Sequence, residues 1–78
     1  MNEQAAAVGQ LVARQLGLDS VAPADRLVED LGAESMDLVT IVAVLEEAYR
    51  VRVDEERLPA MHTVGDLAAE IARLTGGS

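Results

Sequence analysis

Hydrophobic residues recur at helical spacing along the first part of the chain. Residues 2–16 predict a helix because four apolar side chains lie three or four positions apart: Val8, Leu11, Val12 and Leu16. Asn2 is suited to cap the start of this helix, and Gly17 to end it in a left-handed conformation. Gly9, inside the helix, lowers its stability by about 1 kcal/mol relative to alanine. A glycine here indicates a close helix contact.

A second and longer apolar run follows Ser35 and ends near Tyr49. Ser35 is a suitable N-cap, and Asp37 then lies in the first turn, where a negative charge favours the helix dipole. At about 100° per residue, one face of this helix is predicted to be core. That face consists of Leu38, Ile41, Val42, Leu45, Ala48 and Tyr49. The other face is part apolar and part charged: Met36, Val39, Thr40, Ala43, Glu46, Glu47 and Arg50.

The C-terminal third predicts a short helix followed by a longer one. Residues 50–53 alternate like a strand but have no partner strand, so they are interpreted as an extended linker. Residues 54–58 predict a short helix that ends at or near Pro59. Thr63 and Asp66 have capping-box spacing for a last helix that Gly76 and Gly77 terminate. The buried positions expected in it are Val64, Leu67, Ala68, Ile71 and Leu74.

A long connection separates the first two helices, and a loop of this length needs apolar anchors. The expected anchors are Leu18, Val21, Leu27 and Leu31. Pro23 favours an extended Ala22, and residues 25–31 can form a short helical turn. The predicted fold is therefore all-α. It is a small four-helix bundle, with three main helices, one short helix and a long loop between helices I and II.

Composition limits the classes of function. The 78 residues predict one domain over residues 1–78, stabilised by helix packing because the chain has no cysteine. The formal charge of −8 disfavours nucleic acid and anionic membranes and favours basic patches on other proteins. A hydrophobic content of 50% argues against disorder. The start lacks the positive region of a signal peptide, so we expect a cytoplasmic protein. We also expect it to be a monomer.

Several motifs together resemble those of a known family. Leu31-Gly32-Ala33-Glu34-Ser35-Met36-Asp37, followed by Leu45-Glu46-Glu47-Ala48-Tyr49, resembles the acyl carrier proteins, whose attachment motif usually contains Gly-Ala-Asp-Ser-Leu. The resemblance extends to Gln15-Leu16-Gly17, Val28-Glu29-Asp30 and Thr63-Val64, in order and without a large insertion.

This resemblance implies a carrier and not an enzyme. The serine that matches Ser35 attacks the pyrophosphate of coenzyme A with the help of a phosphopantetheinyl transferase. The product is a covalent 4′-phosphopantetheine arm whose thiol carries acyl groups as thioesters. The resemblance also implies that acyltransferase and ketosynthase-type enzymes dock on the second helix through basic patches. The residues expected to contact them are Glu34, Met36, Asp37, Val39, Thr40, Ala43, Glu46 and Glu47.

Other functions fit the sequence less well. A hydrolytic Ser35 needs a nearby base, but His62 is the only histidine and the second glycine of a Gly-x-Ser-x-Gly elbow is missing. The acidic runs lack the spacing of a calcium loop, so no metal site is predicted. An aminoacyl or peptidyl carrier stays open, as does an unmodified acidic interaction module. Glu34, Met36 and Thr40 depart from the usual pattern, Thr40 replacing an acid of many fatty-acid carriers. This favours polyketide or other specialised biosynthesis over fatty-acid synthesis.

Overall fold

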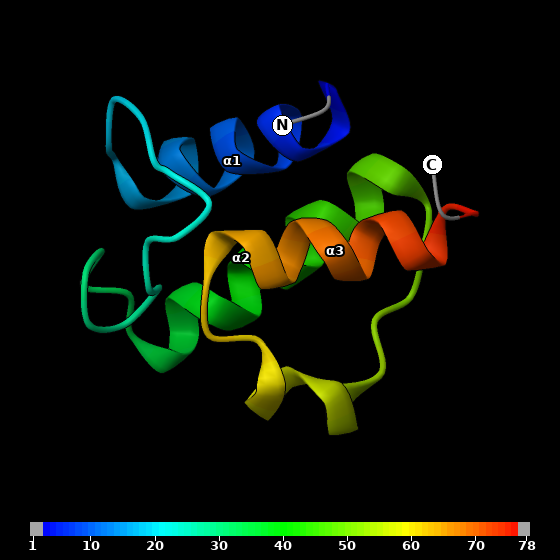
Figure 1. Cartoon of the computed structure of the whole chain (residues 1–78). Helices are drawn as coiled ribbons and strands as arrows, with labels where there is room; N and C mark the ends of the chain where they lie inside the picture. The colour runs from blue at the N-terminus through cyan, green and yellow to red at the C-terminus, as the bar shows by residue number, and fades with distance from the viewer. Residues whose placement is uncertain (1–2, 77–78) are drawn as a thin grey trace.

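The computed structural model describes residues 3–76, which form three α-helices and one short 3₁₀ helix (Figure 1). The elements are α1 (Glu3–Leu16), α2 (Ser35–Tyr49), η1 (Glu55–Ala60) and α3 (Val64–Leu74). In the view of Figure 1, α1 lies above α3 and η1 lies below it. Within residues 3–76, the only β-type pairing is an isolated antiparallel bridge between Arg26 and Thr63. The all-α prediction, with three main helices and one short one, is confirmed.

Helix α1 ends where the sequence predicts. Gly17 has a φ of +72°, and the Leu18 N–H donates to the Ala13 carbonyl at 2.8 Å. The predicted cap Asn2 lies outside the described residues. Gly9 is buried, but a Cβ added there would lie 3.5 Å from Val21 and 3.9 Å from Val64, which is ordinary van der Waals contact. The contact at Gly9 is therefore close without excluding alanine.

Backbone hydrogen bonds hold the long connection between α1 and α2 against the start of α3. The Leu27 N–H donates to the His62 carbonyl at 2.8 Å, and the Gly65 N–H donates to the Pro23 carbonyl at 2.9 Å. The approach at Gly65 is close, because an added Cβ would lie 3.1 Å from the Pro23 oxygen, tighter than ordinary van der Waals contact. The Asp30 N–H bonds to the Arg26 carbonyl at 3.0 Å, so the short helical turn predicted in residues 25–31 is present.

The apolar anchors of this connection are mostly as predicted. Leu27 is buried, and Val21 and Leu31 pack against the core. Leu18 is 38% exposed, so its assignment as an anchor was wrong. The turn at Gly17 places Leu18 beside a surface groove along α1 instead of under the loop.

Helix α2 turns the predicted stripe inward except at its end. Ile41 and Leu45 are buried, while Leu38 and Tyr49 pack at the margin of the core. Ala48 is exposed, and its prediction as a core residue was wrong because it lies at the edge of the predicted stripe, on the last turn. Arg50 ends the helix with a φ of +54°, a left-handed conformation that the sequence did not indicate.

The segment after α2 is extended, as predicted, and leads into η1. Asp54 caps η1 by accepting a hydrogen bond from the Glu56 N–H at 2.9 Å. Pro59 lies inside η1, which ends at the next residue, Ala60, so the predicted end at or near Pro59 is confirmed. Proline has no backbone N–H to donate. The 3₁₀ turn tolerates it because the hydrogen bonds at the two ends of η1 are donated by the N–H groups of Arg57 and Met61.

Helix α3 completes the core. The predicted capping box is present, with the Asp66 N–H donating to Thr63 Oγ1 and the Thr63 N–H donating to Asp66 Oδ2, both at 3.0 Å. The core contains buried residues from all three α-helices and from the long connection. They are Val8, Val12, Leu27, Ala33, Ile41, Leu45, Val64, Leu67 and Ile71. In residues 3–76, the helices are all too short or too polar to cross a membrane.

Candidate functional site

Ser35 is the first residue of α2, and its side chain is exposed. The N-cap is Glu34, whose backbone is extended, so the prediction that Ser35 caps the helix was wrong. The Glu34 N–H donates to Asp37 Oδ2 at 2.9 Å, which satisfies a backbone donor that precedes the helix. Among residues 3–76, the Ser35 hydroxyl has no hydrogen-bond partner. The result is an accessible primary alcohol that the helix start does not use.

The residues before Ser35 fix the position of this hydroxyl. Ala33 is buried, and its N–H donates to the Leu27 carbonyl at 2.9 Å. Gly32 reaches this point with a φ of +72°, and nothing lies within 4 Å of a Cβ added to it. The loop therefore holds the start of α2, while the side of Gly32 where a Cβ would lie is open.

A phosphodiester fits at Ser35. The hydroxyl is exposed, and the positive end of the α2 dipole favours a negatively charged group. The carboxylates of Glu34 and Asp37 oppose this attraction, but Glu34 is exposed, so water and salt screen its charge.

An apolar cavity of about 260 Å³ begins beside Ser35 and extends between α2, η1 and α3. Ser35 and Val39 are among the residues that line it. The remaining lining residues are all apolar: Leu27, Leu38, Ile41, Val42, Leu58, Pro59, Met61 and Leu67. A larger hollow of about 570 Å³ lies along α1, and Ser35 is not among its lining residues. The cavity beside Ser35 therefore suits an apolar group attached to that residue.

The predicted contact face of α2 is largely exposed. Met36 is 72% exposed and Val39 is 56% exposed, so packing within the fold does not explain why these two positions are apolar. Glu34, Ala43 and Glu47 are exposed as well. Exposed apolar side chains that share a helix face with acids are typical of a docking surface.

Three of the predicted contact residues also have roles within the fold. Asp37 accepts the bond from Glu34, and Thr40 Oγ1 donates to the Met36 carbonyl at 3.0 Å. Glu46 is half-buried, and its Oε2 accepts a hydrogen bond from the Val53 N–H at 2.7 Å. Glu46 is therefore less available for a partner than the neighbouring Glu47.

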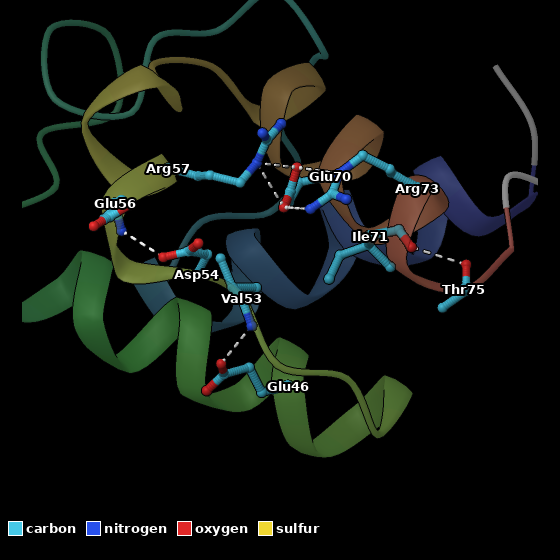
Figure 2. A network of polar contacts seen from close by, with 9 residues as sticks. All are labelled: Glu46, Val53, Asp54, Glu56, Arg57, Glu70, Ile71, Arg73 and Thr75. Atoms are coloured by element: carbon cyan, nitrogen blue, oxygen red, sulfur yellow. Dashed lines mark hydrogen bonds and ion pairs between the residues drawn. The ribbon is translucent and has the colours of Figure 1, made fainter.

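The sequence did not identify the group of charges that joins η1 to α3 (Figure 2). Glu70 is only 5% exposed, although it was not among the positions predicted to be buried on α3. Hydrogen bonds from Arg73, and then from Arg57, lower the pKa of Glu70 below its ordinary value although burial opposes this. The i, i+3 spacing of Glu70 and Arg73 was a signal for one of these pairs, but nothing local indicated Arg57.

Two kinds of comparison place the chain in a family. Residues 6–71 match the family described as phosphopantetheine attachment site. An acyl carrier protein of Syntrophobacter fumaroxidans is 38% identical over 65 residues, covering 81% of this chain and 80% of the relative. An acyl carrier protein of Thermotoga maritima is 37% identical over 71 residues, covering 88% of each.

The fold is also similar to a solved structure. A chain of the structure described as the ishigamide ketosynthase/chain length factor superposes with a TM-score of 0.78 at 25% identity. The match covers 97% of this chain and 99% of that one. The family's members are carriers and not enzymes, and their prosthetic group is 4′-phosphopantetheine. The chain thus belongs to the acyl carrier proteins, the phosphopantetheine-binding carrier family.

Proposed function

We propose that Ser35 is the attachment residue, and that the chain carries acyl intermediates on a 4′-phosphopantetheine arm held there. The observation that carries this proposal is the exposed Ser35 hydroxyl, which has no hydrogen-bond partner within residues 3–76 and lies beside an apolar cavity. Ser20 is exposed too, but it lies in the connection after α1 and lines the other hollow.

The chain's contribution to the attachment is the nucleophilic oxygen and its position. Ser35 Oγ forms the new bond to phosphorus, the pyrophosphate bond of coenzyme A breaks, and the adenosine bisphosphate half leaves. The hydroxyl proton passes to a base of the transferase. The arm supplies a terminal thiol that holds acyl groups as thioesters. Residues of α2, η1 and α3 then offer apolar surface to the cargo.

We place the carrier in polyketide or other specialised biosynthesis. The structural similarity to a chain of a ketosynthase/chain length factor structure supports this assignment. Thr40, where many fatty-acid carriers have an acid, and the basic Arg50 and Arg52 at the end of α2 also support it. The proposed partners are a phosphopantetheinyl transferase, acyltransferases and ketosynthase-type enzymes. Their basic patches would face Glu34 and Glu47, with Met36 and Val39 between them.

Mass spectrometry tests the attachment directly. The unmodified chain is incubated with coenzyme A and a broad-specificity phosphopantetheinyl transferase, and one arm should be added. Ser35→Ala should accept none, whereas the matched variant Ser20→Ala should be modified like the wild type. An arm on Ser35→Ala, or none on the wild type, would refute the proposal. Intact mass of the protein isolated from its host would then identify the cargo as an acyl or an aminoacyl group.

A further inference from the structure

Helix η1 forms one wall of the cavity beside Ser35, yet no residue of η1 is itself buried. Leu58 and Pro59 line the cavity from η1, and Met61 follows directly after it. Segments that bury little apolar surface open at low free-energy cost. Apolar packing is therefore a weak restraint on this wall.

The polar restraint on η1 is concentrated in one side chain. Arg57 Nε donates to both carboxylate oxygens of Glu70 on α3, each at 3.0 Å (Figure 2). The Glu70 side chain is only 4% exposed, whereas that of Arg57 is 51% exposed. Within residues 3–76, this is the only hydrogen bond or ion pair that joins η1 to α3. The other hydrogen bonds of η1 are local, such as those to Asp54.

The residues on either side of η1 are anchored separately. Before it, Val53 is buried and bonded to Glu46 on α2. After it, the His62 N–H donates to Asp66 Oδ2 at 2.8 Å, and the His62 carbonyl accepts from Leu27. With both ends fixed, the segment between them can move away from α3 only if the Arg57–Glu70 contact breaks.

We propose that Arg57 and Glu70 form a latch that holds η1 over the cavity and so determines how well an acyl group on Ser35 is sheltered from water. This inference rests on the proposed attachment at Ser35. Arg57 and Glu70 act as positioning residues: they touch neither the Ser35 oxygen nor the cavity, but they hold Leu58 and Pro59 in its wall.

Arg73 provides a matched control. Its Nη2 lies 2.6 Å from Glu70 Oε2, so Arg73 shares the buried carboxylate, but both residues belong to α3. Arg57→Met and Arg73→Met each remove one cationic partner of Glu70 and keep an apolar stem. Only Arg57→Met disconnects η1. A purely structural role of the ion group would make the two variants alike.

Amide hydrogen exchange on the unmodified chain is the first test, and it does not depend on any attachment. Arg57→Met should exchange about tenfold faster than wild type at residues 56–61, since the lost contact is a charge-assisted hydrogen bond. Arg73→Met should leave exchange in that segment within about twofold of wild type. Arg57→Lys keeps the charge but not the contact with both carboxylate oxygens, so its exchange rate in this segment should lie between those of Arg57→Met and wild type. Equal exchange in Arg57→Met and wild type, or equal acceleration in both Met variants, would overturn the latch.

The second test uses chains loaded from octanoyl-coenzyme A by a phosphopantetheinyl transferase. Hydroxylamine should cleave the octanoyl thioester several-fold faster in Arg57→Met than in Arg73→Met or wild type. Acetyl-loaded chains should show no such difference, because their cargo is too short to occupy the cavity. Faster exchange with an unchanged cleavage rate would overturn the link between the latch and shelter. A failure of loading in every variant would instead refute the attachment at Ser35.

Discussion

Glu46 Oε2 accepts a hydrogen bond from the backbone N–H of Val53, seven residues later, at 2.7 Å. The bond crosses the turn at Arg50 and connects the last turns of α2 to the extended segment that leads into η1. Because Val53 is only 7% exposed, water could not readily replace this acceptor. Glu46 therefore has a structural role that its neighbour Glu47, which is exposed, does not have.

Removing the Glu46 carboxylate should destabilise the fold. We expect Glu46→Ala to lower the free energy of unfolding by about 1–2 kcal/mol, since the buried Val53 N–H loses its acceptor. Glu46→Gln keeps an oxygen acceptor and should lose less. Glu47→Ala should stay within about 0.5 kcal/mol of the wild type. Urea unfolding of the three variants checks this, and equal losses at positions 46 and 47 would contradict it.

Glu47 is the better position at which to test partner docking. Glu47→Arg should slow loading by the transferase or by a cognate acyltransferase, and the effect should be larger at low salt, because exposed charges act mainly on the association rate. Reversal of Glu46 as well would confound the measurement with a loss of stability. The control is the circular dichroism melting curve of Glu47→Arg, which should match that of the wild type. Loading kinetics that keep their wild-type salt dependence would rule out docking through this acid.

Thr40→Glu tests the choice of pathway. The substitution introduces the acid common in fatty-acid carriers, and it removes a hydroxyl that bonds only to the Met36 carbonyl of its own helix. If the natural partners belong to a specialised pathway, turnover by fatty-acid synthase enzymes should rise in the variant. Unchanged or lower turnover, with an unchanged melting curve, would argue that Thr40 does not discriminate between partners.

Acid should destabilise the protein through Glu70 and Asp66. Hydrogen bonds from Arg73 and Arg57 lower the pKa of Glu70, and backbone hydrogen bonds from His62 and then Thr63 lower the pKa of Asp66. A carboxyl group whose pKa is lower in the folded state stabilises the fold above its unfolded pKa. That stabilisation is lost as the pH falls through the folded pKa. Unfolding free energy should therefore decline below about pH 4.

Glu70→Gln isolates one part of this acid response. The variant should be less stable than wild type at neutral pH. The difference should begin to shrink near the ordinary carboxyl pKa of about 4 and continue to shrink as the pH falls towards the lower pKa of folded Glu70. Urea unfolding over a pH series measures both curves. If the two curves stayed parallel down to acid denaturation, the Glu70 carboxylate would not be the group responsible.

Added salt should raise the melting temperature. Residues 25–56 contain only three arginines but ten acids. The acids are Asp25, Glu29, Asp30, Glu34, Asp37, Glu46, Glu47, Asp54, Glu55 and Glu56. Within that segment, the one ion pair that the structure shows is Arg26–Asp30 at 3.2 Å, on the surface. Salt screens the remaining repulsion. A melting temperature independent of sodium chloride between about 10 and 500 mM would show that this repulsion costs the fold nothing.

The helices and their core faces were predictable because one apolar side chain every three or four residues repeats within each element. The start of α3 was predictable for a similar reason, since the capping box of Thr63 and Asp66 depends only on two residues three positions apart. Ala48 was assigned wrongly because periodicity gives the direction of a side chain and does not tell which other element covers it. The same limit explains Leu18: the left-handed turn at Gly17 was predicted, but the sequence did not show what would cover the side chain that follows it.

The site was predictable at Ser35 and less so around it. The motif indicated Ser35, but it did not show that Glu34 would be the cap. The contacts Glu46–Val53 and Arg57–Glu70 join residues 7 and 13 positions apart and depend on how the segment between α2 and α3 folds back. No local pattern encodes them. Glu46 was consequently assigned to the contact face of α2, and Glu70 was given no role.

The capping of α2 by Glu34 and Asp37 has a consequence for the chemistry of Ser35. If the Ser35 hydroxyl capped the helix, esterification would remove a hydrogen bond from the helix start, and each attachment would weaken the fold. The carboxylate of Asp37 accepts the Glu34 N–H instead, so the oxygen of Ser35 is free to change its substituent. Every enzyme that meets this carrier, before or after its modification, would then find α2 beginning at the same residue and presenting the same side chains.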